Sequence, residues 1–153
     1  MGEGVPKDGE KAEFEFIRAA WNENREAREW VRKEAERGNA RAQMTLGGLF
    51  NRGCGVSHDK AESKKWYQMA LKQYCDAATR GNADAQFELA KIYKMGEGVP
   101  RDLAKATEWY VKAGEQGHIE AQYMLLVLNH NDHPHAQGQA RGKWVAAKIR
   151  RKR

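Results

Sequence analysis

Apolar side chains recur at intervals of three and four residues along most of this chain, which is the spacing of one face of an α-helix. Residues 82–95 and 102–116 show the pattern most clearly. The first stripe consists of Ala85, Leu89, Ile92 and Tyr93, and the second consists of Ala106, Trp109, Tyr110 and Ala113. Each segment is therefore predicted to be a helix with one buried face.

The stretch GEGVP, residues 96–100, separates these two helices. Its two glycines allow a tight reversal of the chain, and Pro100 fits the first turn of a following helix. Asn82 is a favoured N-cap, and Gly117 is a favoured residue just beyond a helix C-terminus. Residues 81–117 are thus predicted to form a hairpin of two antiparallel helices.

The hairpin pattern occurs in tandem along the chain. GNARAQ at 38–43 returns as GNADAQ at 81–86 and as GHIEAQ at 117–122. The first interval is seven residues longer than the second, and the extra residues follow Trp66 and Tyr67. Seven residues add about two helical turns and rotate an apolar stripe little, so we expect a longer helix there.

One hairpin cannot cover its own apolar face, so neighbouring hairpins must stack. The sequence therefore predicts an all-α fold, a short right-handed α-solenoid of antiparallel helical hairpins. Residues 1–140 are assigned to the solenoid and 141–153 to a basic C-terminal tail. The expected units are about 1–37, 38–80, 81–116 and a degenerate 117–149.

Two segments carry a more specific pattern, in which G-x-G-V is followed by Asp and then by Trp-Tyr. They are LGGLFNRGCGVSHDKAESKKWYQMA at 46–70 and AKIYKMGEGVPRDLAKATEWYVKAGEQG at 90–117. This pattern resembles the Sel-one-like repeat (SLR), a relative of the tetratricopeptide repeat, and the resemblance covers about residues 1–128. It implies an adaptor or scaffold, often bacterial, in signalling, envelope assembly, virulence or toxin–immunity pairs.

Both ends depart from the repeat. MGEGVP opens the chain at 1–6 and returns at 95–100, so the first copy of the turn has no helix before it. We expect either that a partner covers this open edge or that the true start lies upstream. The helix after the first turn either continues or breaks near residues 22–24. At the other end, KWVAAK at 143–148 is similar to a worn second helix.

The formal charge of +6 is concentrated in the tail, whereas residues 1–140 are nearly neutral. The tail has seven basic residues and no acidic one, namely Arg141, Lys143, Lys148, Arg150, Arg151, Lys152 and Arg153. Lys and Arg attract nucleic acid, anionic membranes and acidic proteins alike. Nucleic-acid association through the tail is therefore an alternative function, beside a tail that merely solubilises the terminus.

The only dense cluster of metal-ligating residue types is HNDHPH, with His130, Asp132, His133 and His135. Imidazole and carboxylate groups suit zinc or nickel. Pro134 marks a turn that fixes no tetrahedral geometry, so we expect a polar loop and no cofactor.

No catalytic constellation stands out elsewhere. GEGVP lacks the GK[ST] ending and the preceding strand of a phosphate loop. A branch of the resembled family binds or slowly hydrolyses β-lactams, but its paired cysteines are missing here. Only Cys54 and Cys75 are present, and we expect both to be free thiols. The chain is therefore predicted not to be an enzyme, with a β-lactam-binding or metal-dependent hydrolase as the alternative.

The first helix of each unit is expected to line a concave face that binds a protein or peptide. Positions pointing away from the core follow from 100° of rotation per residue. The candidate residues are Arg41, Met44, Thr45, Asp84, Phe87, Glu88, Lys91, Glu120, Tyr123 and Met124. The row of Met44, Phe87 and Tyr123 also fits packing between neighbouring hairpins.

No apolar stretch approaches the roughly 20 residues of a membrane-spanning helix. The first thirty residues contain several acids and no apolar core of a signal peptide. A cytoplasmic location is therefore expected, or a periplasmic or secreted one if the true start lies upstream.

Overall fold

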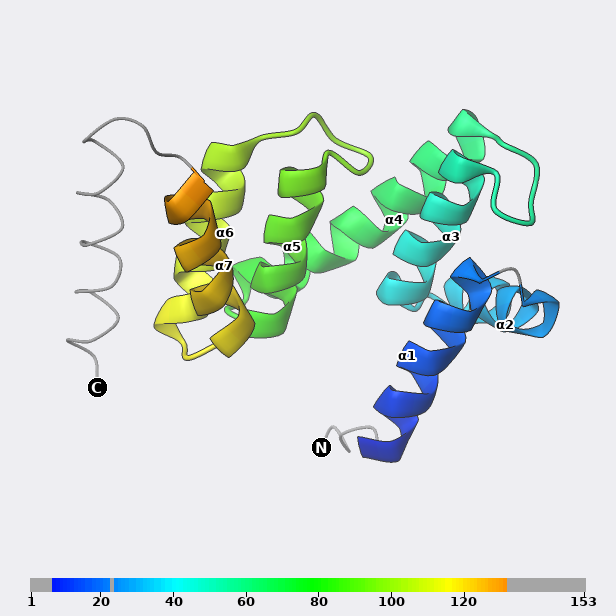
Figure 1. Ribbon diagram of the computed structural model, residues 1–153, viewed down its shortest axis with the longest axis horizontal. Helices are drawn as coiled ribbons and strands as arrows, with labels where there is room; N and C mark the ends of the chain where they lie inside the picture. Colours follow the sequence, from blue (N-terminus) through cyan, green and yellow to red (C-terminus); the bar gives the residue numbers. More distant parts are fainter. Residues whose placement is uncertain (1–6, 23, 132–153) are drawn as a thin grey trace. The chain divides into compact units, whose positions relative to one another are not determined.

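The computed structural model describes residues 7–22 and 24–131, and these form seven helices and no strand (Figure 1). The helices are α1 (Lys7–Trp21), α2 (Arg25–Glu36), α3 (Ala40–Arg52), α4 (Lys60–Thr79), α5 (Ala83–Met95), α6 (Leu103–Glu115) and α7 (Ile119–Asn131). The predicted all-α class is confirmed. The chain divides into two compact units, Met1–Lys72 and Gln73–Arg153, which are described separately below.

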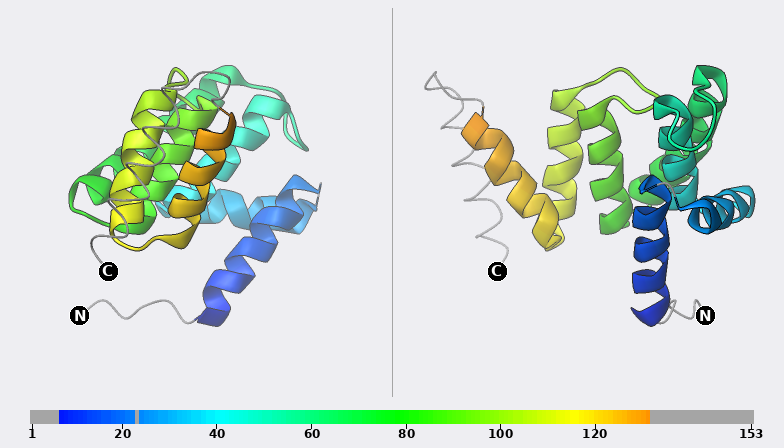
Figure 2. Two further views of the ribbon diagram at one scale, coloured as in Figure 1. Left: turned by 60° about the vertical axis from the view of Figure 1, so that its left-hand side comes forward. Right: turned by 45° about the vertical axis from the view of Figure 1, so that its right-hand side comes forward.

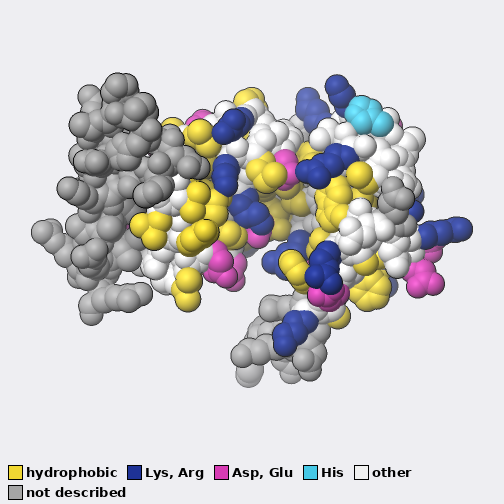
Figure 3. Space-filling model, viewed as in Figure 1, with side chains coloured by type: hydrophobic (Ala, Val, Ile, Leu, Met, Phe, Trp, Pro, Cys, Tyr) yellow, Lys and Arg dark blue, Asp and Glu magenta, His cyan; other side chains and the backbone are white. Residues whose placement is uncertain are grey.

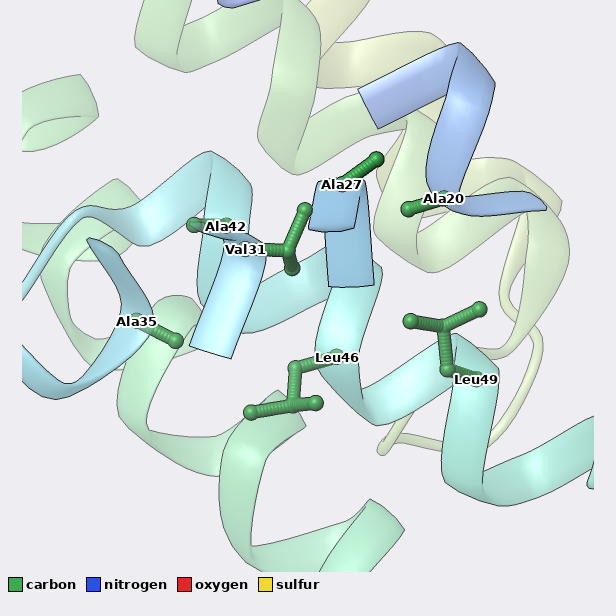
Figure 4. Close-up of a cluster of buried hydrophobic side chains, with 7 residues drawn as sticks. All are labelled: Ala20, Ala27, Val31, Ala35, Ala42, Leu46 and Leu49. Atoms are coloured by element: carbon green, nitrogen blue, oxygen red, sulfur yellow. The ribbon is translucent and has the colours of Figure 1, made fainter. Parts of the chain in front are cut away.

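The first unit is built around α1, α2 and α3. Its core consists of small and aliphatic side chains from all three helices, shown in Figure 4: Ala20, Ala27, Val31, Ala35, Ala42, Leu46 and Leu49. Alanines on α2 and α3 allow the helices to approach closely, and larger partly buried side chains surround them.

The first helical segment breaks near residues 22–24, which was one of the two expected possibilities. Helix α1 ends at Trp21, and the side chain of Asn24 caps α2 by accepting a hydrogen bond from the Ala27 N–H (2.9 Å). The break lets α1 fold back on α2, where Phe16 stacks on Trp30 with ring centroids 5.0 Å apart.

Two glycines of α3 allow bulky rings to lie against its backbone. A Cβ added to Gly47 would lie 2.8 Å from Tyr67 Cδ1, and one added to Gly48 would lie 2.5 Å from Trp21 Cη2. Both distances are shorter than van der Waals contact, so only glycine fits these neighbours at their observed positions. Trp21 thereby covers one side of α3.

Helix α4 is continuous, and its 20 residues exceed the 13 residues of α6 by the seven-residue insertion. The expected lengthening of this helix is confirmed.

The second unit contains the end of α4, then α5, α6 and α7. Helices α5 and α6 lie side by side, and α7 packs on α6 (Figure 2). Six buried residues form one core cluster of this unit: Ala90, Ala106, Tyr110, Ala113, Ala121 and Leu125.

The repeated turn has one geometry in its two described copies. Gly53 and Gly96 end the preceding helices with φ of 69° and 76°, in the left-handed region where glycine is favoured. In the later copy, Asp102 caps α6 by accepting from the Lys105 N–H (2.9 Å), and this hydrogen bond lowers the pKa of its carboxyl group. The two GxGV segments are therefore structural turns.

Candidate functional site

The first helix of each hairpin is anchored at its N-terminus by a side-chain cap. Asn39 and Asn82 accept hydrogen bonds from the N–H groups of Ala42 (2.9 Å) and Ala85 (2.8 Å). In α7 the same position is His118, whose Nδ1 accepts from the Ala121 N–H at 3.2 Å. The three helices that carry candidate residues therefore start in the same way.

A second anchor is a glutamine that sequence reasoning did not single out. Gln43, Gln86 and Gln122 each donate from Nε2 to the carbonyl eight residues earlier, at 3.0, 3.0 and 2.8 Å. Those carbonyls belong to the last turns of the preceding helices, and each also accepts a hydrogen bond from the backbone N–H of the glycine three residues later. The signal was present, because each glutamine follows alanine in the repeated hexapeptide.

His118 is the centre of the candidate surface in the second unit. Its ring stacks on Phe87 with centroids 4.5 Å apart and an angle of 23° between the planes. Nδ1 accepts the capping hydrogen bond, so the proton of the neutral ring is on Nε2. Nε2 lies 3.4 Å from Asp84 Oδ1.

Two predicted site residues from different hairpins meet at this ring. Asp84 of α5 approaches Nε2, and Glu120 of α7 approaches Nδ1 with its Oε2 at 3.3 Å. The imidazole is only 10% exposed, whereas the side chains of Asp84 and Glu120 are 90% and 72% exposed. The result is a pair of solvent-facing carboxylates on a buried, fixed platform.

The remaining charged candidates of α5 neutralise one another. Lys91 Nζ lies 2.7 Å from Glu88 Oε2 and 5.4 Å from the centre of the Phe87 ring. Burial, with a contribution from Glu88, raises the pKa of the neighbouring Tyr110 to about 12. The net negative charge of this surface therefore comes from Asp84 and Glu120.

The apolar candidates differ in their surroundings. Phe87 is half-buried between Tyr110 and His118, so it packs against the following hairpin. Met44 is half-buried, and Met124 packs against the core of the second unit. Tyr123, which corresponds to Phe87 in the repeat, is 63% exposed.

In the first unit, Arg41 is exposed but Thr45 is buried. The Thr45 hydroxyl donates to the Arg41 carbonyl at 3.0 Å, and only 6% of the residue is exposed. The helical rotation that placed Thr45 on an open face took no account of α1, whose Trp21 covers the next turn at Gly48. The structure does not present Thr45 to a partner.

The predicted metal-binding residues and the basic tail lie almost entirely outside the residues that the structure describes. His130 is in α7, but its side chain is not described, and Asp132, His133, His135 and residues 141–153 lie outside the described residues. Among the described residues, no three His, Cys, Asp or Glu side chains are grouped to hold a metal ion.

Both cysteines are free thiols. Burial together with the charge of Asp76 raises the pKa of the Cys75 thiol. A raised pKa lowers the thiolate fraction and hence nucleophilic reactivity.

Of the helices that the structure describes, none combines the length and apolar character needed to span a bilayer.

The surface charges are mixed. Figure 3 shows basic, acidic and apolar side chains interspersed over one face of the described residues.

Comparisons with known proteins identify the repeat. The Sel1 repeat pattern matches residues 1–20, 40–75 and 83–118. A Sel1 repeat protein from Oxalobacter formigenes is 37% identical over 76% of this chain and 86% of that chain, with a TM-score of 0.42. A protective antigen of uropathogenic Escherichia coli with an SLR fold is 22% identical over 93% of this chain, with a TM-score of 0.46. This chain spans 37% of the length of that antigen. No curated protein matches.

Proposed function

Because the chain belongs to the Sel1 repeat family of helical protein-interaction modules, we propose that it is a non-catalytic adaptor that binds a basic protein or peptide segment. The observation that carries the proposal is the meeting of Asp84 and Glu120 on the His118 ring. On the surface around His118, these two exposed carboxylates have no lysine or arginine partner among the ion pairs of the described residues, whereas Glu88 pairs with Lys91.

The rigidity of the site favours binding. Asp84 and Glu120 are in the first turns of α5 and α7, and both helices start from fixed caps. His118 is held by its capping hydrogen bond and by its stacking on Phe87. The backbone that carries both carboxylates is therefore ordered before binding, which lowers the entropic cost of association.

The chemistry of the site favours a lysine or arginine side chain in the partner. A guanidinium or ammonium group bound near His118 would donate hydrogen bonds to both carboxylates. Charge complementarity of this kind governs association rate and specificity more than the total area buried. Glu88 contributes less, because Lys91 already neutralises it.

The experiment is affinity capture with the full chain, quantified by mass spectrometry, in three forms: the natural protein, Asp84→Lys with Glu120→Lys, and Glu108→Lys. Glu108 is exposed on α6 and serves as the matched control. The proposal requires a partner that the double variant loses and the control retains. A partner that all three forms capture equally would refute the assignment of the face.

A further inference from the structure

Helix α7 is apolar on two opposite faces. Ala121, Leu125 and Leu128 are on the side that packs into the core of the second unit. Ile119, Tyr123 and Leu126 follow each other at spacings of four and three, and they are 75%, 63% and 62% exposed. These three residues are called the outer stripe of α7. A helix that is apolar on both sides is expected to be buried on both sides.

The preceding hairpin shows what normally covers this stripe. Repeat alignment places Phe87 of α5 at the position of Tyr123, and Ala90 at that of Leu126. In α5 this face is covered: Phe87 contacts Tyr110 of α6 and His118, and Ala90 is buried. The outer stripe is therefore a face of the kind that packs within a hairpin. The exposed face of a terminal repeat is normally polar, so an exposed apolar stripe at this position calls for a cover.

The chain continues beyond α7 with a segment of suitable composition. KWVAAKI, residues 143–149, corresponds to the second-helix sequence around Trp109 and Tyr110, with Val145 at the position of Tyr110. Residues 132–142 span up to about 35 Å, and α7 is about 20 Å long, so residue 143 onward can reach any point on the stripe.

We propose that residues 143–149, which lie outside the described residues, bind to the outer stripe of α7 in the same chain. Val145 then contacts Tyr123 as Tyr110 contacts Phe87. This part of the basic tail thereby covers the apolar face of the last described helix. This inference goes beyond the proposed function, and it removes Tyr123 from the partner-binding surface while leaving Asp84 in it.

The test is hydrogen exchange followed by mass spectrometry on the full chain, in three forms: natural, Tyr123→Ser with Leu126→Ser, and the control Met69→Ser. Tyr123, Leu126 and Met69 are all exposed, and the exchange of residues 83–95 reports whether the second unit remains folded. The amides of 143–149 are expected to exchange at least ten-fold more slowly in the natural chain and in the control than in the double variant.

Three outcomes would overturn the inference. In the first, residues 143–149 of the natural chain exchange at the rate of an unstructured peptide. In the second, their protection survives the double substitution. In the third, their protection disappears on dilution together with a dimer seen by sedimentation, so that a second copy is the occupant. None of these outcomes bears on capture by Asp84, so the two proposals fail independently.

Discussion

The imidazole of His118 stacks on the ring of Phe87 with ring centroids 4.5 Å apart, and so joins two successive hairpins of the second unit. The same ring caps α7 and contacts the carboxylates of Asp84 and Glu120. One residue thereby links the packing of the repeat to the surface proposed to bind a partner.

The substitution His118→Ala is expected to lower the free energy of unfolding by about 1–2 kcal/mol, because it removes both a helix cap and an aromatic stack. His118→Asn restores the cap found at Asn39 and Asn82 and is expected to recover about half of the loss. Urea titration followed by circular dichroism measures both variants. Equal destabilisation by alanine and asparagine would show that the cap contributes nothing.

The substitution Gln86→Leu is expected to destabilise the chain by about 1–3 kcal/mol, because it removes two hydrogen bonds: one donated to the carbonyl of buried Ala78 and one accepted from Gln116 Nε2. Gln68→Leu, at an exposed position of α4, is the control and is expected to change stability by less than about 0.5 kcal/mol. Thermal unfolding of the two variants side by side gives the comparison. If both shift the melting temperature alike, the glutamine anchor is not a stabilising element.

The substitution Gly47→Ala is expected to destabilise by about 1–2 kcal/mol, although alanine is normally the better helix former. The added methyl group would meet the ring of buried Tyr67 at 2.8 Å. In Gly114→Ala the nearest atom is Gln122 Cγ at 3.3 Å, on a flexible side chain, so the cost is smaller. Urea titrations of the two variants make the comparison, and a stabilised Gly47→Ala would contradict the packing described here.

The stability of the chain is expected to fall between pH 10 and 12 by about 1–2 kcal/mol through Tyr110. Burial raises its pKa to about 12, whereas the unfolded chain ionises this phenol near 10. Below pH 10 both states hold the proton, and above it the unfolded state loses the proton first.

The control for this pH dependence is Tyr110→Phe. The Tyr110 hydroxyl is buried and has no hydrogen-bond partner among the residues that the structure describes, so the substitution is expected to cost little at pH 7. Urea titrations at pH 8 and pH 11.5 should show that the free energy of unfolding falls less for Tyr110→Phe than for the natural chain. An identical loss would assign the effect to other groups.

Local sequence features predicted much of the fold. The apolar stripes predicted the hairpins, the repeated glycines predicted the turns, and the insertion after Trp66 and Tyr67 predicted a longer α4. Each of these depends on residues close together in the chain, where helix geometry fixes the spacing.

The features that were not predicted depend on contacts between elements. Thr45 was placed on an open face because helical rotation alone does not reveal that Trp21 packs against α3. The meeting of Asp84 and Glu120 depends on the distance between two hairpins, which the sequence does not encode locally. The substitution of His118 for the capping asparagine was visible in GHIEAQ, but its stacking on Phe87 was not.

The most direct test of the proposed binding face is zero-length carbodiimide coupling of carboxylates to amines in the complex with a captured partner, followed by mass spectrometry. Asp84 and Glu120 are expected to couple to lysines of the partner, and excess salt should abolish the coupling because it screens the charges. Coupling that leaves both carboxylates unmodified and joins the partner only through acids elsewhere, such as Glu108, would contradict the account.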